Sequence, residues 1–268
     1  MEFHYPQTPK ETTTLLKKPS SLAVAGGTSF IGEPRAKHLV DLTGLGLDYI
    51  EDKKTKIIIG ATTPVADLVE SHALGRLASG ILHSAASTLA DTSLRNMITV
   101  GGNIACRFNW ADLPPALMVL SAKLRVTGDR KREIPVEKFF ESRLKPGEFI
   151  SEIIIPKKSN KGKGAFIKFS RTKFDYSLIT VATYAEQQGK KTSVIRVAIS
   201  GVSHPTRVKA VEKELQGKAV TEELLEKTAP QAIKEIPIEK SYIFSENYRR
   251  EVLGVLLKRG LMKVLMEG

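Results

Sequence analysis

Short apolar runs alternate with helix-like patterns over roughly the first 155 residues of the chain. Apolar runs bounded by turn residues are typical of strands, and apolar positions spaced three and four apart are typical of helices. Strands are predicted over residues 21–25, 38–42, 56–60, 122–126 and 150–156, and helices over 63–71, 80–90 and from 112 onward. In the first helix Thr63 is the predicted N-cap and Pro64 the first helical residue. This mixture of strands and helices predicts an α/β or α+β fold.

A connector separates this part of the chain from a second domain. Residues 157–164 read KKSNKGKG, which is charged, glycine-containing and without hydrophobic periodicity. The pattern that follows predicts strands over 165–170, 179–186 and 193–202, and helices over 207–215 and 246–265. We therefore predict one domain over residues 1–157 and a second over 164–268, the second being a small antiparallel sheet with helices.

The chain has the size and composition of a globular protein. At 268 residues it can form two modest domains with real cores, and its contents of 41% hydrophobic and 26% charged residues are ordinary for such proteins. No stretch approaches the roughly 18 to 20 uninterrupted apolar residues of a membrane span, and the first 18 residues lack the apolar core of a signal peptide. A cytoplasmic protein without a membrane span is therefore expected.

The chain is strongly basic, with 41 Lys and Arg against 29 Asp and Glu and a net charge of +12. Such a charge favours anionic ligands, nucleic acid or an acidic partner. An ordinary solvated surface explains it equally well, because the basic runs fall in turn-like segments. Nucleic-acid-binding proteins interleave aromatic residues with Lys and Arg. Aromatic residues make up only 6% of this chain and no nucleic-acid-binding motif is found, so we disfavour that class.

Two glycine-rich turns carry the clearest chemical signal. The first, AGGTSF at 25–30, directly follows a predicted strand, and the second, TVGGN at 99–103, precedes a helix-forming segment. Paired glycines let main-chain N–H groups approach a phosphate closely. Either turn alone could be merely a tight turn, but two of them could hold the two phosphates of a dinucleotide. Neither fits GxGxxG or GxxxxGK[ST], which disfavours a Rossmann fold and a P-loop.

Other catalytic or metal-binding signals are weak. The single cysteine, Cys106, excludes an internal disulfide and an iron–sulfur cluster held by cysteines of this chain alone. The five histidines show no HExxH and no paired metal spacing, and each is interpreted as structural; they are His4, His38, His72, His83 and His204. If electrons move through this protein, an organic cofactor carries them.

Four sequence blocks, in a specific order and spacing, connect the chain to a known family. They are AGGTSF at 25–30, LVDLTGLGLDYIE at 39–51, LRNMITVGGNIA at 94–105 and ADLPPALMVLSAKL at 111–124. With them the chain resembles the FAD-binding (medium) subunits of the xanthine dehydrogenase, carbon monoxide dehydrogenase and aldehyde oxidoreductase family of molybdenum hydroxylases. The resemblance extends nearly to the end of the chain. It implies an α+β fold, in which two α/β subdomains (PCMH-type) enclose FAD and a C-terminal domain with a three-stranded antiparallel sheet and helices follows.

The resemblance also assigns cofactor-binding residues. Backbone amides of both glycine turns would hold the pyrophosphate and adjoining flavin atoms, with Thr28, Thr99 and Asn103 adding side chains. The implied positions are Ala23, Val24, Ala25, Gly26, Gly27, Thr28, Ser29 and Phe30 in the first turn, and Thr99, Val100, Gly101, Gly102 and Asn103 in the second.

Six further positions are implied around the cofactor. Asp112 would accept hydrogen bonds from hydroxyls of the cofactor. Alternatively it is a helix N-cap, and one residue can have both roles. Leu89 and Ile150 would flank the cofactor, or lie in the core. Lys168 would stand beside the flavin, or be a solvated strand lysine. Asp175 and Tyr176 would control access to the flavin face.

The chain departs from the family pattern at two places near the second turn. Ile98 stands where a glycine is usual, and Asn109 where a proline is usual. These departures leave the backbone geometry of residues 97–110 open.

The resemblance implies an electron-transfer flavoprotein with no catalytic residue or metal of its own. It would hold FAD non-covalently and accept electrons from a small [2Fe-2S] subunit. Substrate oxidation would take place on a large molybdopterin subunit, which chooses the organic substrate. The electron acceptor stays open among NAD, oxygen, quinone and other carriers. The alternative is a stand-alone FAD-dependent oxidoreductase of the same fold, which would need acid–base residues in which the C-terminal segment is poor.

Overall fold

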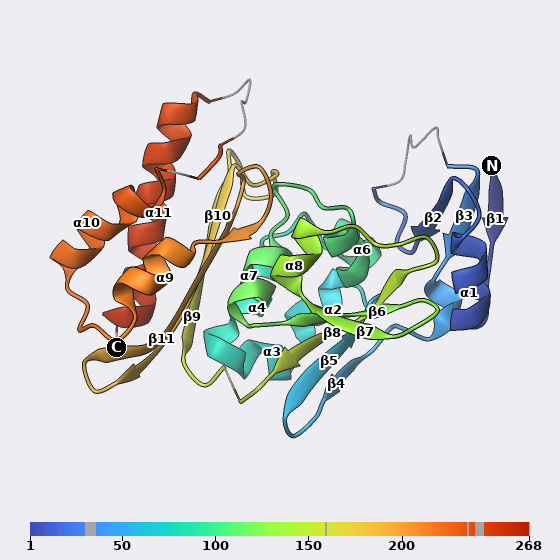
Figure 1. Cartoon of the computed structure of the whole chain (residues 1–268), viewed down its shortest axis with the longest axis horizontal. Helices are drawn as coiled ribbons and strands as arrows, with labels where there is room; N and C mark the ends of the chain where they lie inside the picture. The colour runs from blue at the N-terminus through green and yellow to red at the C-terminus, as the bar shows by residue number, and fades with distance from the viewer. Residues whose placement is uncertain (30–35, 159, 235, 239–243, 268) are drawn as a thin grey trace.

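The computed structural model of the chain describes residues 1–29, 36–158, 160–234, 236–238 and 244–267. Its three sheets lie one after another along the longest axis of the molecule, with the N-terminus at one end and the C-terminal helices at the other (Figure 1). Each of these parts combines helices with a sheet, and the predicted α+β fold class is confirmed.

The N-terminal sheet is parallel, in the order β1-β3-β2. Helix α1 packs against it and begins where the sequence dictates: Thr8 is the N-cap, its hydroxyl accepts from Glu11 N, and Pro9 is the first helical residue. The elements of this part are β1 (Glu2–His4), α1 (Pro9–Leu16), β2 (Ser21–Val24), β3 (His38–Asp41) and the 3-10 helix η1 (Thr43–Leu45).

The central part contains an antiparallel sheet in the order β4-β5-β8-β6-β7, with helices packed beside it. The isoleucine-rich strands β5 and β8 pair in register and their alternate residues are buried in the largest core of the molecule. The strands are β4 (Ile50–Asp52), β5 (Lys56–Gly60), β6 (Lys123–Thr127), β7 (Arg132–Pro135) and β8 (Phe149–Pro156). The helices are α2 (Val65–Glu70), α3 (His72–Arg76), η2 (Leu77–Gly80), α4 (Ile81–Ser87), α5 (Thr92–Met97), α6 (Val100–Ala105), α7 (Leu113–Val119) and α8 (Val136–Glu141).

The C-terminal part is built on three long antiparallel strands, β9 (Lys163–Phe169), β10 (Ile179–Gln188) and β11 (Lys191–Ser200). The two-residue strand β12 (Thr206–Arg207) pairs beside β11. One face of this sheet packs on α4 and α7 of the central part, and the other carries α9 (Lys209–Leu215), α10 (Glu222–Ala232) and α11 (Glu246–Leu265) (Figure 1). The C-terminal sheet therefore shares one core with the central part and forms a second with its own helices.

Two local predictions differ from the structure. Thr63 does not cap α2, because its fully buried hydroxyl accepts from Tyr49 N and donates to Tyr49 O, and Pro64 takes the cap position with an extended backbone. Helix α10 was not predicted, because Pro230 interrupts its pattern. The proline is tolerated close to the end of the helix, and the Thr221 hydroxyl caps the first turn.

No helix within the described ranges combines the length and apolar character that crossing a membrane requires.

Candidate functional site: a groove beside two glycine turns

The first glycine turn leaves the carboxyl end of β2 and packs tightly against the end of α5. A Cβ atom on Gly26 would lie 1.6 Å from the carbonyl oxygen of Met97, so only glycine allows this approach. Gly27 has φ of +70°, a left-handed conformation that also favours glycine. Within the described residues, the amides of 26–29 make no hydrogen bond to the protein. Four N–H groups are therefore available to a ligand; Phe30 lies outside the described residues.

The second glycine turn is the start of helix α6 and not an open loop. The Thr99 hydroxyl caps it by accepting from Gly102 N, and Asn103 N donates to Thr99 O. The amides of Val100 and Gly101 donate to carbonyl oxygens of Thr63 and Ala61. These four amides, of residues 100–103, are thus paired within the chain. That this turn holds phosphate through its backbone stays a prediction.

Val100 and Gly101 are buried and line neither of the two hollows described below. A Cβ atom on Gly101 would meet the Cβ atom of Ala61 at 2.6 Å and its carbonyl oxygen at 2.7 Å. A substitution at Gly101 therefore tests packing between α6 and the end of β5. It does not test phosphate binding.

A continuous groove runs between the first turn, α6 and the C-terminal part. It consists of a hollow of about 370 Å³ along the first turn and α6, and a smaller one of about 150 Å³ that reaches β9 and the segment 174–177. The two hollows share the residues Thr28, Ser29, Ile98, Asn103 and Phe108. The first is also lined by Ala23, Val24, Ala25, Gly26, Gly27, Thr99 and Gly102, and the second by Leu89, Asp112, Lys168, Asp175 and Tyr176.

Asn103 presents an unused acceptor at the junction of the two hollows. Its Oδ1 atom is buried and has no hydrogen-bond partner in the protein. A buried acceptor without a partner costs roughly 1 to 3 kcal/mol. A ligand with an N–H or O–H group at this point would remove that cost.

We therefore expect Asn103→Ala to lower affinity for FAD about tenfold, or ~1.4 kcal/mol, through loss of one hydrogen bond. The thermal stability of the FAD-free chain should stay the same or rise, because an unpaired buried acceptor is removed. Titration calorimetry and thermal melts check this, with Asn96→Ala on the exposed face of α5 as the control. A less stable chain with unchanged affinity would show instead that Asn103 is structural.

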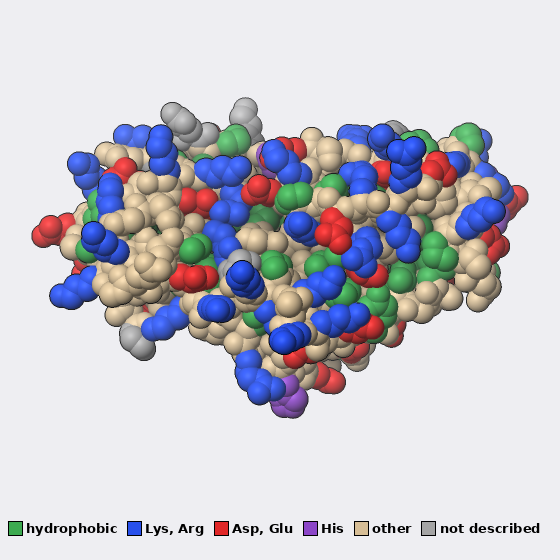
Figure 2. Space-filling view, turned by 60° about the horizontal axis from the view of Figure 1, so that its bottom comes forward, with side chains coloured by type: hydrophobic (Ala, Val, Ile, Leu, Met, Phe, Trp, Pro, Cys, Tyr) green, Lys and Arg blue, Asp and Glu red, His purple; other side chains and the backbone are tan. Residues whose placement is uncertain are grey.

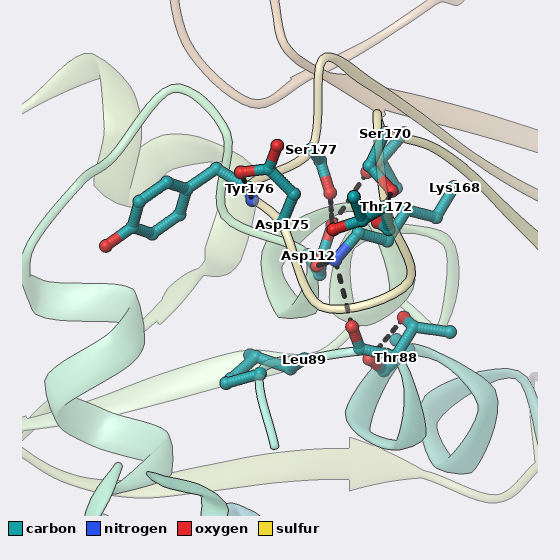
Figure 3. A network of polar contacts seen from close by, with 12 residues as sticks. Thr88, Leu89, Asp112, Lys168, Ser170, Thr172, Asp175, Tyr176 and Ser177 are labelled. Carbon is teal, nitrogen blue, oxygen red and sulfur yellow. Dashed lines mark hydrogen bonds and ion pairs between the residues drawn. The ribbon is translucent and has the colours of Figure 1, made fainter.

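Asp112 is the centre of a buried polar network that joins the central part to the C-terminal part (Figure 3). Its side chain is 5% exposed and accepts from Ser177 Oγ, from Thr180 Oγ1 at 2.8 Å and from Lys168 Nζ at 3.1 Å. It makes no cap hydrogen bond to α7. Three of the roughly four lone-pair positions of the carboxylate are therefore occupied. Asp112 thus stands at the predicted N-cap position of α7 without capping it through its side chain, and one acceptor position is left for a ligand.

Lys168 is not a solvated strand lysine. Its side chain is 7% exposed, and its Nζ atom donates to Asp112 and, at 2.9 Å, to Thr88 O (Figure 3). Residues that lie 56 positions apart in the sequence thus form one ion pair at the side of the smaller hollow. The positive charge at the groove is balanced by Asp112.

Asp175 and Tyr176 lie in the segment between β9 and β10, at the edge of the smaller hollow. Hydrogen bonds from the Arg171 guanidinium and from the backbone N–H of Tyr176 hold the pKa of Asp175 below its usual value. Tyr176 points away from the Asp112 network and is 73% exposed (Figure 3). The segment therefore carries a charge already paired with Arg171 and an aromatic ring at the mouth of the groove.

Sequence reasoning missed an aromatic cluster beside the groove. Phe108 and Trp110 stack with ring centroids 4.7 Å apart, and Tyr176 meets Trp110 at 5.3 Å. All three line the smaller hollow. The sequence did contain a signal for this cluster, because the only tryptophan of the chain stands two residues after a phenylalanine in an otherwise polar passage.

The remaining positions are placed as follows. Leu89 lines the smaller hollow, whereas Ile150 is 4% exposed in the core on β8 and lines neither hollow. Ile98 lines both hollows. The Asn109 carbonyl accepts from Gly201 N at 2.6 Å, so this departure from the family pattern contacts the C-terminal part.

The match to family models decides what this groove belongs to. Residues 1–158 match the FAD binding domain in molybdopterin dehydrogenase, and residues 164–264 match the CO dehydrogenase flavoprotein C-terminal domain. The chain belongs to the family of FAD-binding subunits of molybdopterin dehydrogenases. It is thus a flavoprotein subunit of the oxidoreductase class, as the four sequence blocks predicted.

Similar proteins align over nearly the whole chain. The carbon monoxide dehydrogenase medium chain of Hydrogenophaga pseudoflava is 29% identical, covering 97% of this chain and 95% of the relative. The glyceraldehyde dehydrogenase medium chain of Sulfolobus acidocaldarius is 28% identical, covering 90% and 89%. In the solved carbon monoxide dehydrogenase from Hydrogenophaga pseudoflava, one chain superposes with a TM-score of 0.92 at 26% identity, covering 99% of this chain and 96% of that one.

The residues at the groove fit the FAD that this family binds. The first turn offers unpaired amides for a pyrophosphate, and Asn103 offers an unpaired acceptor for a cofactor N–H or hydroxyl. Phe108, Trp110 and Leu89 supply apolar surface beside them. A dinucleotide with an aromatic ring system matches this arrangement.

Proposed function

We propose that the chain is the electron-transfer subunit of a molybdenum hydroxylase complex. FAD, when bound, supplies a ring system that takes up electrons and releases them again. In the proposed complex the electrons come from a small [2Fe-2S] subunit and pass to an external acceptor. The organic substrate is oxidised elsewhere, on a large molybdopterin subunit.

One observation carries the proposal. Each charged side chain that lines the groove among the described residues is already ion-paired: Asp112 with Lys168, and Asp175 with Arg171. A stand-alone oxidoreductase would need a free acid or base there to activate its substrate. A groove without a free acid or base supports a role in cofactor binding. It argues against an enzyme that oxidises its own substrate there.

Each part of the groove then has a proposed task. The amides of residues 26–29 hold the pyrophosphate, and Asn103 fixes the cofactor at the junction of the hollows. We propose that residues 1–157 form the cofactor domain and residues 164–268 the C-terminal domain. The Lys168–Asp112 pair holds the sheet of the C-terminal domain against the cofactor domain. Asp175 and Tyr176 limit what approaches the exposed edge of the ring. Ile150 supports the strand β8 from within the core.

The partner subunits are proposed on two grounds. The relatives are described as medium chains or as a subunit of a dehydrogenase complex, which places them in multi-subunit assemblies. The net charge of +12 favours acidic partner surfaces. On the face shown in Figure 2, Lys and Arg are interspersed with Asp and Glu and do not form a single stripe, which does not favour a nucleic-acid partner.

Purification of the tagged chain from its native host tests the complex. We expect two further subunits to co-purify, with molybdenum and iron found by metal analysis and with turnover of an organic substrate. High salt should weaken the association if charge contributes to it. Recovery of a lone flavoprotein that oxidises aldehydes or purines without molybdenum would favour the stand-alone oxidoreductase.

Flavin is expected to be non-covalent, at one FAD per chain. Acid precipitation should release it into the supernatant, where its absorbance spectrum measures the amount. Flavin that stays with the precipitated protein would contradict non-covalent binding. A colourless chain that cannot be reconstituted with FAD would contradict the site itself.

A further inference from the structure

Three side chains outside the groove converge at the other end of the N-terminal sheet. Glu2 and His4 lie on β1, and His38 begins β3. The strands are parallel with Glu2 opposite His38, and residues two apart on a strand share a face. Register therefore brings all three side chains to one face of the pair, although 34 residues separate the two histidines.

Their ligand atoms form a compact triangle. His4 Nε2 lies 3.1 Å from His38 Nδ1, which lies 3.1 Å from Glu2 Oε2, and the third side, from Glu2 Oε2 to His4 Nε2, is 3.6 Å. A tetrahedral Zn²⁺ ion with bonds of about 2.0 to 2.2 Å holds its ligand atoms roughly 3.3 to 3.5 Å apart. A point about 2.1 Å from all three atoms therefore exists without moving the backbone.

The chemistry of the triangle also favours a cation. Two imidazole nitrogens and a carboxylate oxygen face one another, and each carries a lone pair when the rings are neutral and the carboxylate is ionised. The histidine side chains are only 21% and 22% exposed, whereas Glu2 is 66% exposed and leaves the triangle open to solution on one side.

We propose that Glu2, His4 and His38 bind one divalent transition-metal ion of the Zn²⁺ class, with water at the fourth position. Imidazole and carboxylate ligands suit such ions. The ion would fasten the three-residue strand β1 to β3 at the sheet edge. The proposal gives His4 and His38 a ligand role where the sequence favoured a structural one.

The site is separate from the groove. His38 pairs with Ser21 at the start of β2, whereas the first glycine turn follows the end of that strand. Metal binding and flavin binding can therefore be tested independently, and the failure of one leaves the other standing.

Zinc titration of the full-length, FAD-loaded chain, freed of its purification tag and treated with chelator, tests the proposal. We expect one Zn²⁺ per chain in the wild type. His4→Ala, His38→Ala and Glu2→Gln should each weaken binding by more than about tenfold, since even residues that only support a metal ligand cost that much when mutated. His72→Ala and His204→Ala, which remove histidines outside the triangle, should bind as the wild type does.

Folding of each variant is checked by its retained FAD and circular dichroism, and the exposed Glu2→Gln serves if a histidine variant fails to fold. Replacement of Zn²⁺ by Co²⁺ should give the intense visible bands of a tetrahedral ion. A wild-type chain that binds no stoichiometric Zn²⁺ would overturn the proposal. Equal affinity of His38→Ala and His204→Ala would do the same, because binding would then involve only the N-terminal segment or scattered surface groups.

Discussion

The Gly26→Ala variant is expected to lose FAD while the rest of the chain stays folded. The added Cβ atom would lie 1.6 Å from Met97 O and 2.7 Å from its carbonyl carbon, and both are backbone atoms that cannot rotate away. The first turn must therefore move off α5, which displaces the unpaired amides of residues 26–29 from the ligand. We expect affinity for FAD to fall at least about 100-fold, or ~2.7 kcal/mol.

Gly75→Ala is the matched control for this experiment. A Cβ atom on Gly75 has no atom within 4 Å, and the residue lies in helix α3, where alanine is favoured over glycine. Flavin content after purification and fluorescence titration with FAD measure the difference. Wild-type affinity in a folded Gly26→Ala chain would mean that the first turn does not hold the cofactor in the geometry described.

The Asp112→Ala variant is expected to be the most destabilised single substitution at the site. It leaves the Lys168 ammonium buried without its carboxylate and removes the acceptor for Ser177 and Thr180. Removing one partner of a buried ion pair costs roughly 3 to 5 kcal/mol. Denaturant unfolding should show this loss, and the contact between α7 and the C-terminal sheet should loosen first.

A double variant separates the charge effect from simple loss of packing. Asp112→Ala combined with Lys168→Met removes both charges and should recover part of the lost stability, because no unpaired ammonium remains. Glu214→Ala, which removes an exposed partner of Lys218, is the control and should leave stability unchanged. Additive effects of the two substitutions at the network would contradict direct coupling between Asp112 and Lys168.

Local sequence signals predicted much of the fold but not its long-range pairings. The strand 56–60 and the helix 246–265 were predicted with their observed bounds, because each has a clear periodic pattern and well-defined ends. Segment 92–105 contains two short helices that the polar, glycine-rich composition concealed. Their N-caps, Asp91 and Thr99, were visible only as ordinary polar residues.

The groove shows the same division. The first turn needs glycines for its close backbone approach and its positive φ, and the Gly-Gly pair in the sequence indicates this need. The sequence does not indicate which residues these positions contact. The contact of Gly26 with Met97 and the ion pair of Asp112 with Lys168 depend on how sheets and helices pack, and residue spacing along the chain does not predict them. The family resemblance supplied the identity of these residues, and the structure supplied their partners.

Anaerobic reduction of the flavin tests the central claim most directly. The isolated FAD-loaded chain and the complete native complex are each mixed with the organic substrate of that complex, and flavin absorbance is followed. The account predicts bleaching in the complete complex and none in the isolated chain, because the chain only receives electrons from a partner. Bleaching of the isolated chain at the rate of the complex would contradict its role as an electron-transfer subunit.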